Sequence, residues 1–273
     1  MLDPVAFHLG GLAIRWYGVC FALAFLAGYL ALVLRAPRYG LTGERAGDLA
    51  LTAMVGGVLG ARVWYVVQNW DNTFAGAPLE IFRIDHGGLV FYGGFLMALA
   101  ALAVMCRRWR LPFAAAGDLF APALPLAHAL GRLGCFLNGC CFGRPWHGAC
   151  AVTYPAAGDV HAVQLRLGVP GVTDAGPLPV FPIQLVEAGA NVALAAALLL
   201  IERRTSRRGL LFPVYLACYA LIRFAGEFAR GDYLSRPGGL TSAQWLCLLL
   251  FPAALAWGVV AWRRAGGLRD AGK

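Results

Sequence analysis

Long apolar runs separated by short polar or basic segments dominate the chain. A helix needs roughly 20 apolar residues to cross about 30 Å of hydrocarbon. Runs of that length predict seven membrane-spanning helices, so the expected fold class is an all-α polytopic membrane protein. The predicted spans cover residues 16–34, 49–68, 89–106, 117–137, 182–201, 210–228 and 242–262.

Composition supports this interpretation. Hydrophobic residues make up 60% of the 273 residues and charged residues only 14%, whereas about a quarter of the residues in soluble domains are charged. The formal net charge of +9 comes from basic residues clustered between the apolar runs. This pattern is typical of membrane topology, and we expect no nucleic-acid partner.

The basic clusters also predict orientation. Most of the 23 Lys and Arg residues follow the first, third, fifth and seventh spans. Basic loops stay on the cytoplasmic side, which puts the N-terminus outside and the C-terminus inside. The longest connection, residues 138–181, then lies outside and is too long for a simple turn. We expect one integral membrane domain, residues 1–273, with this segment as a small head between spans four and five.

Ionisable residues within the predicted spans are candidates for function, because charge is costly in lipid. Arg223 and Glu227 are four residues apart and share one helix face. Arg230 continues that face outward, and Tyr219 lies one turn inward. One carboxylate beside two arginines leaves positive charge for an anion. The alternative is a neutralising ion pair with no other role.

The fourth span repeats this spacing with His128 and Arg132. Arg132, Arg223 and Arg230 are therefore predicted to form an outward-facing anion site, and guanidinium groups match phosphate oxygens well. A lipid phosphate is the anion most available at that depth. Arg62 in the second span is either a fourth member or a partner for Glu187.

Glycines mark close helix packing and a special turn. Gly56 and Gly60 have the spacing typical of helix–helix contact in membranes. Paired glycines at residues 87–88 and 93–94 flank the start of the third span. Because glycine loosens the backbone and admits close neighbours, we predict an irregular or broken start to this helix.

Four cysteines lie in one loop, namely Cys135, Cys140, Cys141 and Cys150. Their spacing lacks the paired Cys-x2-Cys of structural zinc sites, so we expect no metal and no cofactor. A disulfide from one of the adjacent cysteines to Cys150 is an alternative on an outer face. The chain also has no Gly-x-Ser-x-Gly, Walker loop or His-Glu-x-x-His motif, which weighs against serine hydrolases, nucleotide-driven pumps and zinc proteases.

Several ordered motifs resemble those of the prolipoprotein diacylglyceryl transferase family, and the similarity covers nearly the whole chain. Any one of them is weak, but their order on a seven-span frame is specific. The motifs are Ile14–Gly18, Gly87–Gly94, Gly131–Gly139, Gly143-Arg144, Pro182–Glu187 and Arg223-x3-Glu227-x2-Arg230.

The resemblance implies a bacterial inner-membrane enzyme with a periplasmic head and active site. It would transfer the diacylglyceryl group of phosphatidylglycerol to the lipobox cysteine thiol of a preprolipoprotein, releasing glycerol phosphate. Because no extra association helix is visible in the sequence, we expect a monomer. Arg132 and Arg223 would hold the phosphate. The resemblance assigns the pocket to Tyr17, Asn138, Gly143, Arg144, Glu187 and Glu227, beside Tyr219 and Arg230 from the spacing argument.

The chain departs from the family pattern at three notable positions. Tyr92 stands where the family commonly has His, Cys135 where it has Asn, and Cys140 where it has Glu. Tyr92 is a poor base at neutral pH, though it can orient or hydrogen-bond a phosphate. His86, beside the first glycine pair, and His128, one turn from Arg132, are the imidazoles that can compensate. We expect His128 to pack beside the phosphate site and take part in it.

Two other functions fit the same residues. A paralogue could keep the lipid site and act on another acceptor. A non-catalytic protein could bind or translocate a phospholipid, with the arginines holding only the head group. Catalysis requires an outside-facing acceptor entrance and a base, whereas a binding protein needs neither.

Overall fold

The protein is mainly helical. The computed structural model describes residues 4–83, 87–205, 207–232 and 237–270. Within these residues, six helical segments are long and apolar enough to cross a membrane, which defines a multi-pass membrane protein. They are Trp16–Tyr39, Gly43–Gln68, Phe91–Arg108, Phe113–Asn138, Ile183–Arg204 and Ser242–Arg263.

The chain divides into two compact units. One contains Met1–Gly28 and Phe120–Lys273, and the other contains Tyr29–Leu119. Helix α1 (Trp16–Arg35) begins in the first unit and ends in the second. Each unit is described below by itself.

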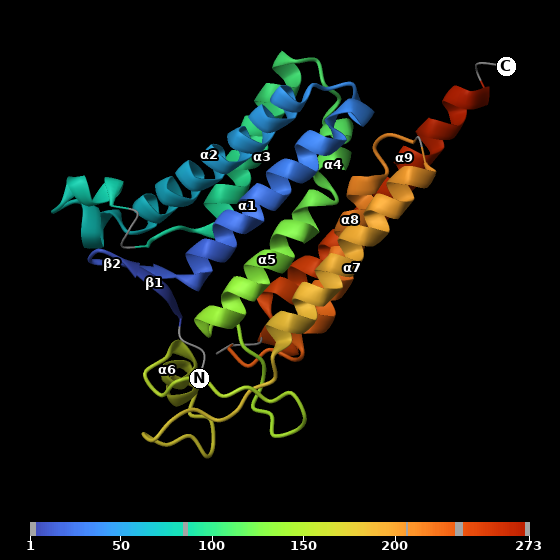
Figure 1. Cartoon of the computed structure of the whole chain (residues 1–273). Helices are drawn as coiled ribbons and strands as arrows, with labels where there is room; N and C mark the ends of the chain where they lie inside the picture. The colour runs from blue at the N-terminus through green and yellow to red at the C-terminus, as the bar shows by residue number, and fades with distance from the viewer. Residues whose placement is uncertain (1–3, 84–86, 206, 233–236, 271–273) are drawn as a thin grey trace. The chain divides into compact units, whose positions relative to one another are not determined.

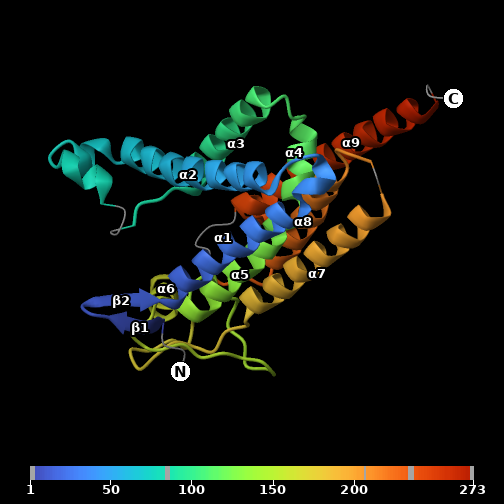
Figure 2. The same ribbon diagram turned by 45° about the horizontal axis from the view of Figure 1, so that its top comes forward.

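The unit Tyr29–Leu119 is built on a helix pair. After the 3-10 turn η1 (Ala36–Tyr39), α2 (Gly43–Gln68) begins at Thr42, whose hydroxyl accepts from the Arg45 backbone N–H at 3.3 Å. The partner helix is α3 (Phe91–Arg108), and both views draw it beside α2 (Figures 1 and 2). The remaining elements are the π-helix η2 (Trp70–Phe74), the 3-10 helix η3 (Pro78–Phe82) and α4 (Phe113–Phe120).

Glycines bring α2 and α3 into backbone contact, as the spacing predicts. A Cβ on Gly60 would lie 2.4 Å from the Gly93 carbonyl oxygen, and one on Gly94 would lie 2.7 Å from the Gly57 carbonyl oxygen. Any larger side chain would push the helices apart. This confirms the predicted helix–helix contact at Gly56 and Gly60.

An irregular segment precedes α3, also as predicted. Gly87 and Gly88 both have positive φ angles, 84° and 77°, which L side chains rarely adopt. The Val90 N–H donates to the Ala61 carbonyl oxygen at 3.1 Å, which ties this segment to α2. Helix α3 therefore begins at Phe91, two residues later than the predicted span.

Arg62 of α2 anchors the same segment. Its guanidinium donates to the carbonyl oxygens of five residues. These bonds commit Arg62 to a structural role, so its interpretation as a fourth anion ligand or as a partner for Glu187 is wrong. The five carbonyls are those of Glu80, Ile81, Arg83, Gly87 and Gly88.

The other unit holds a helix cluster. Helices α5 (Ala123–Asn138) and α8 (Leu211–Glu227) both contact α7 (Ile183–Arg204), and α8 also packs along α9 (Ser242–Asp270), as Figures 1 and 2 show. Leu194, Leu198, Leu211 and Tyr215 form a buried cluster between α7 and α8. The predicted fourth span is interrupted, because α4 (Phe113–Phe120) ends before Pro122 and α5 begins after it; proline lacks the N–H that would continue the helix.

A short hairpin precedes α1, which the sequence analysis did not predict. Strands β1 (Val5–Leu9) and β2 (Leu12–Arg15) pair antiparallel, with Phe7 opposite Ile14 and Leu9 opposite Leu12. Gly10 supplies the positive φ of 59° that the tight turn needs.

The segment predicted as a head has its own small core. Phe142, Tyr154, Val160 and Val180 are buried together around α6 (Asp159–Arg166). The His161 ring nitrogens lie 2.6 and 2.9 Å from the carbonyl oxygens of residues 156 and 173. The loops of this core gather at the end of α5 and the start of α7 (Figure 1).

Candidate active site

Three arginines and three carboxylates alternate across α5, α7, α8 and the segment after α8. Each neighbouring pair lies within ion-pair distance. All but Asp232 have side chains at most 15% exposed, where removal of one partner would leave an uncompensated charge. In order, this ion-pair chain consists of Arg132, Glu187, Arg223, Glu227, Arg230 and Asp232.

Glu187 of α7 joins the two helices beside it. Its Oε2 lies 2.8 Å from Nε of Arg132 on α5, and its Oε1 lies 3.4 Å from Nη1 of Arg223 on α8. Gly226 permits this approach, because a Cβ there would lie 3.0 Å from Oε1 of Glu187. Glu187 is thus the central anion of the chain, a placement that α7 periodicity alone does not predict.

The outer half follows from the predicted spacing on α8. Glu227 is fully buried and pairs with Arg223 one turn earlier and with Arg230 at 3.9 Å. Arg230 also donates from Nε and Nη2 to the two oxygens of Asp232, at 3.0 and 2.6 Å. This paired geometry is the strong form of a guanidinium–carboxylate contact.

The six side chains carry three positive and three negative formal charges. The prediction that one carboxylate beside two arginines leaves positive charge for an anion is therefore wrong, since Glu187 and Asp232 complete the neutralisation. A phosphate cannot rely on surplus charge here. It must instead use guanidinium N–H donors that the carboxylates leave available.

Arg132 has such donors. Its Nε–H donates to Nε2 of His128 at 3.1 Å. Within the described ranges, no hydrogen-bond partner lies at its terminal Nη1 and Nη2 groups. The side chain as a whole is 11% exposed, so most of it is shielded from solvent.

His128 packs beside Arg132, as predicted. Its ring also lies 5.4 Å from the Tyr219 ring, which stacks on Tyr215 at 5.8 Å. Because Nε2 accepts the Arg132 bond, its lone pair is not available to a substrate proton. His128 therefore orients Arg132 in this structure.

The loop after α5 is held by backbone contacts at Gly143. The Gly143 N–H donates to the Phe181 carbonyl oxygen at 3.1 Å, and the Arg144 N–H donates to the Ala229 carbonyl oxygen at 2.9 Å. A Cβ on Gly143 would lie 2.3 Å from the Phe181 oxygen. These contacts fix the loop beside Arg230. The exposed Arg144 guanidinium lies 6.0 Å from the centroid of the Trp146 ring.

Tyr17 and Asn138 lie at different places: Tyr17 packs on the side of α5, and Asn138 is the last residue of that helix. Tyr17, half-exposed, packs against Gly134, where a Cβ would lie 3.4 Å from the tyrosine ring. Asn138 ends α5 and lines an open depression of about 480 Å³ toward the head. None of the arginines of the ion-pair chain lines that depression.

Tyr154 secures the end of α5 from the head. Its hydroxyl donates to the Phe136 carbonyl oxygen at 2.9 Å. Burial raises its pKa to about 12, against the lowering effect of a hydrogen bond from Gln184. The ring packs on Gly139, whose positive φ of 75° ends the helix.

Gln184 of α7 makes a contact that its place in the Pro182–Glu187 motif does not predict. It is fully buried, and its Nε2 donates to the Cys140 carbonyl oxygen at 2.9 Å. Its Oε1 has no hydrogen-bond partner among the described residues. The amide thereby links α7 to the cysteine loop.

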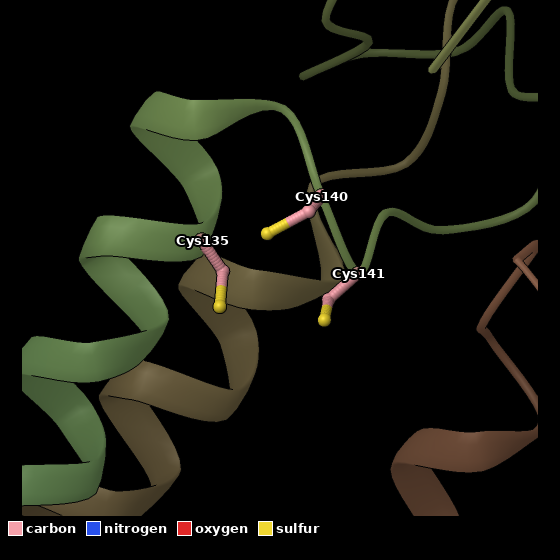
Figure 3. Close-up of side chains that lie close together, drawn as sticks. All are labelled: Cys135, Cys140 and Cys141. Atoms are coloured by element: carbon pink, nitrogen blue, oxygen red, sulfur yellow. The ribbon is translucent and has the colours of Figure 1, made fainter. Parts of the chain in front are cut away.

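Cys135, Cys140 and Cys141 lie together at the end of α5, with their sulfur atoms all within 4.8 Å of one another (Figure 3). Hydrogen bonds from Cys135 and Cys140 lower the pKa of the Cys141 thiol far below its usual value; Arg230 and Arg132 lower it further, and burial opposes them. Hydrogen bonds with Cys135 and Cys141, together with burial, raise the pKa of the Cys140 thiol.

The alternative of a disulfide to Cys150 is wrong. All eight cysteines are free thiols, and Cys150 is exposed. Loop spacing cannot decide this pairing, because it does not show that the chain directs Cys150 to solvent.

Tyr92 lies in the other unit, at the start of α3. It is 57% exposed and its ring meets Phe91 edge-on at 5.9 Å. His86, the other imidazole predicted to compensate for it, falls outside the described residues.

Apolar helices long enough to cross a membrane, together with a largely buried ion-pair chain, define a multi-pass membrane protein with a polar site among its helices. The chain belongs to the prolipoprotein diacylglyceryl transferase family, whose sequence model matches residues 4–260.

The chain is similar in sequence to relatives over nearly their full length. Among them are proteins called phosphatidylglycerol–prolipoprotein diacylglyceryl transferase from three bacteria. The one from Cupriavidus necator is 34% identical, covering 97% of this chain and 94% of the relative. That from Cupriavidus pinatubonensis is 35% identical, over 96% and 92%, and that from Paraburkholderia xenovorans is 34% identical, over 96% and 94%.

Proposed function

We propose that this protein transfers the diacylglyceryl group of phosphatidylglycerol to the lipobox cysteine thiol of preprolipoproteins and releases glycerol phosphate. The observation that carries the proposal is family membership over residues 4–260, together with relatives of that name at about one-third identity. The intramembrane ion-pair chain supplies the donors that such a reaction needs.

The proposal includes a seven-span topology in the bacterial inner membrane. Helix α8 would supply the one span missing from the six long apolar segments, and it is the sixth of the seven in chain order. At 17 residues it is slightly short, but it packs along α7 and α9. The basic clusters favour an outer N-terminus and a cytoplasmic C-terminus. The whole chain then forms one membrane domain, residues 138–181 form a periplasmic head, and the site opens to the periplasm. We propose that it acts as a monomer.

Arg132 and Arg223 hold the lipid phosphate in this proposal. The terminal Nη groups of Arg132 can bind two phosphate oxygens, while Glu187 and His128 hold its Nε end. Because the ion-pair chain is neutral before binding, it holds the guanidinium groups in position at depth without a net charge in lipid.

Charge development explains why arginines are needed. The phosphate of phosphatidylglycerol carries one negative charge, and cleavage of the glyceryl carbon–oxygen bond adds a second to the departing glycerol phosphate. Donors already aimed at that oxygen stabilise the transition state more than the substrate.

Other residues shape the pocket. We assign substrate contacts to Tyr17 and Asn138 around α5, to Gly143 and Arg144 in the following loop, and to Tyr219 on α8. Glu187, Glu227 and Arg230 fix the arginines that bind. Tyr92 would orient or hydrogen-bond the phosphate, and His128 would position Arg132.

Two observations favour the non-catalytic alternative, a protein that only binds or translocates phospholipid. His128 Nε2 already accepts a hydrogen bond from Arg132, and Tyr92 replaces the usual family histidine. Such a protein needs no means of activating a thiol.

The test is incubation of the purified full-length protein with a lipobox peptide in phosphatidylglycerol micelles, read by mass spectrometry. A gain of one diacylglyceryl group on the peptide is expected, with no gain on a peptide carrying serine in place of cysteine. Phospholipid binding without any gain would support the binding protein instead.

A further inference from the structure

The thiols of Cys135, Cys140 and Cys141 form a donor cluster that the phosphate site does not use. Cys135 is the last-turn residue of α5, and the other two follow in the turn that ends it (Figure 3). The Cys140 N–H donates to the Cys135 carbonyl oxygen at 3.1 Å, and Gln184 holds the Cys140 carbonyl oxygen at 2.9 Å. These two bonds hold the Cys140 backbone against α5 and α7.

Cys141 has a strained backbone. Its φ is +58°, a left-handed value that is costly for a residue with a Cβ. Such strain persists where the surroundings impose it, and it is common at functional sites. In this backbone conformation the Cys141 sulfur lies within 4.8 Å of the sulfur atoms of Cys135 and Cys140.

Three thiols with no disulfide are the donor set of a thiophilic metal ion. Zn²⁺ binds cysteine sulfur at about 2.3 Å, and catalytic zinc sites commonly have three protein ligands with a fourth position open. Tetrahedral bonds of that length put sulfur atoms roughly 3.8 Å apart. The cluster, with all sulfurs within 4.8 Å, needs only small side-chain rotations to reach this geometry.

The cluster also adjoins the phosphate site. Cys135 lies three residues after Arg132, on the same face of α5. Three thiolates and Zn²⁺ carry one negative charge, and a fourth thiolate would make it two. Nearby guanidinium groups favour both states.

We propose that Cys135, Cys140 and Cys141 bind one Zn²⁺ ion, whose open fourth position takes the acceptor thiol. The second part rests on the proposed function. Zinc binding releases the thiol proton and leaves a thiolate, as metal coordination does for sulfur ligands. A thiolate formed in this way needs no histidine base.

The transfer step then balances. The acceptor sulfur forms a bond to the glyceryl carbon, and the bond between that carbon and the phosphate oxygen breaks. Its electron pair leaves on the oxygen of glycerol phosphate, which takes up a proton equivalent to the one released from the thiol. The thioether product is a weaker zinc ligand than the thiolate and can leave.

Metal content tests the site without any need for activity. The full-length protein is purified with Zn²⁺ present, dialysed and analysed for metals, beside Cys140→Ser, Cys141→Ser and the exposed control Cys150→Ser. The wild type and the control should hold about one zinc per chain, and the two cluster variants at least tenfold less. Equal zinc in all four proteins, no zinc in the wild type, or copper in its place would overturn the zinc site.

Cobalt substitution tests the open position. Co²⁺ in the cluster should give a thiolate-to-metal charge-transfer band, which a lipobox peptide should shift and its serine analogue should not. No shift with the cysteine peptide would refute acceptor binding.

Chelation separates the two proposals. Loss of transfer in metal-stripped protein, restored by Zn²⁺, supports both. If the metal-stripped protein transfers at an undiminished rate, zinc does not bind the acceptor thiol for the reaction, and the proposed function still holds. Absence of transfer in the zinc-loaded protein contradicts the proposed function, whereas zinc content still decides the site.

Discussion

Glu187 of α7 lies with Oε2 2.8 Å from Nε of Arg132 on α5, and both side chains are nearly buried. Its other oxygen reaches Arg223 of α8 at 3.4 Å. One carboxylate therefore connects the two arginines proposed to hold phosphate, and it fixes three helices relative to one another.

Replacement of Glu187 by Gln should destabilise the protein strongly. Removal of one partner from a buried pair costs about 3–5 kcal/mol, because the remaining charges are uncompensated. The matched control is Glu80→Gln, whose side chain is 33% exposed and pairs with the exposed Arg83; such pairs contribute about 0–1 kcal/mol. Thermal unfolding in detergent should separate the two variants clearly. Equal unfolding temperatures would contradict a structural role for Glu187.

Gly143→Ala should damage the loop between α5 and the head. The new Cβ would lie 2.3 Å from the Phe181 carbonyl oxygen, so the backbone bond between these residues cannot survive unchanged. Gly189→Ala is the control, since a Cβ there meets nothing within 4 Å and helical Gly→Ala stabilises by about 0.5–1 kcal/mol. We expect a lowered unfolding temperature only for Gly143→Ala. An unchanged temperature would show that the loop is held elsewhere.

His128→Ala should reduce kcat/KM about tenfold, through loss of one hydrogen bond that orients the Arg132 guanidinium. His128→Gln, which keeps an acceptor, should recover part of that loss. The pH profile of the residual activity should match that of the wild type, because Nε2 is not the base. Unchanged turnover in His128→Ala would show that His128 takes no part, and a lost acidic limb would show that it transfers a proton.

Tyr154 makes stability depend on alkaline pH. Its pKa is raised from 10.0 to about 12, chiefly by burial, so folding favours the neutral phenol. The stabilisation is complete below pH 10.0 and is lost as pH rises through about 12. Tyr154→Phe should be less stable than wild type at neutral pH by about 1 kcal/mol, and the gap should narrow above pH 10.0. A gap that stays constant with pH would refute this linkage.

Local spacing was sufficient to predict some of these features. The apolar runs predict the six helical segments that are long enough to cross a membrane, with ends that differ by up to about six residues; the seventh predicted run forms α8, which is shorter. The α8 contacts among Arg223, Glu227 and Arg230 follow from intervals of three and four residues. A local pattern also exists for β1 and β2, where apolar residues alternate on either side of Gly10 and Gly11, as is typical of a hairpin. A search for long apolar runs does not detect strands this short.

Contacts between distant segments could not be predicted in this way. Glu187 meets Arg132 and Arg223 only because α7 packs between their helices. Asp232 pairs with Arg230 through the turn after α8, where helical periodicity has ended. The cysteine cluster depends on the backbone conformation of Cys141, which spacing does not specify.

The most direct measurement is the initial rate of diacylglyceryl transfer to a lipobox peptide by wild type, Arg132→Ala and the surface control Arg83→Ala, with folding of each protein checked by thermal unfolding. Loss of a donor to developing charge costs roughly 10²–10³ in rate. We expect a mass gain with wild type and with the control, and a rate lowered by that factor in Arg132→Ala. Equal rates for folded Arg132→Ala and wild type would contradict a role for Arg132 in holding the phosphate.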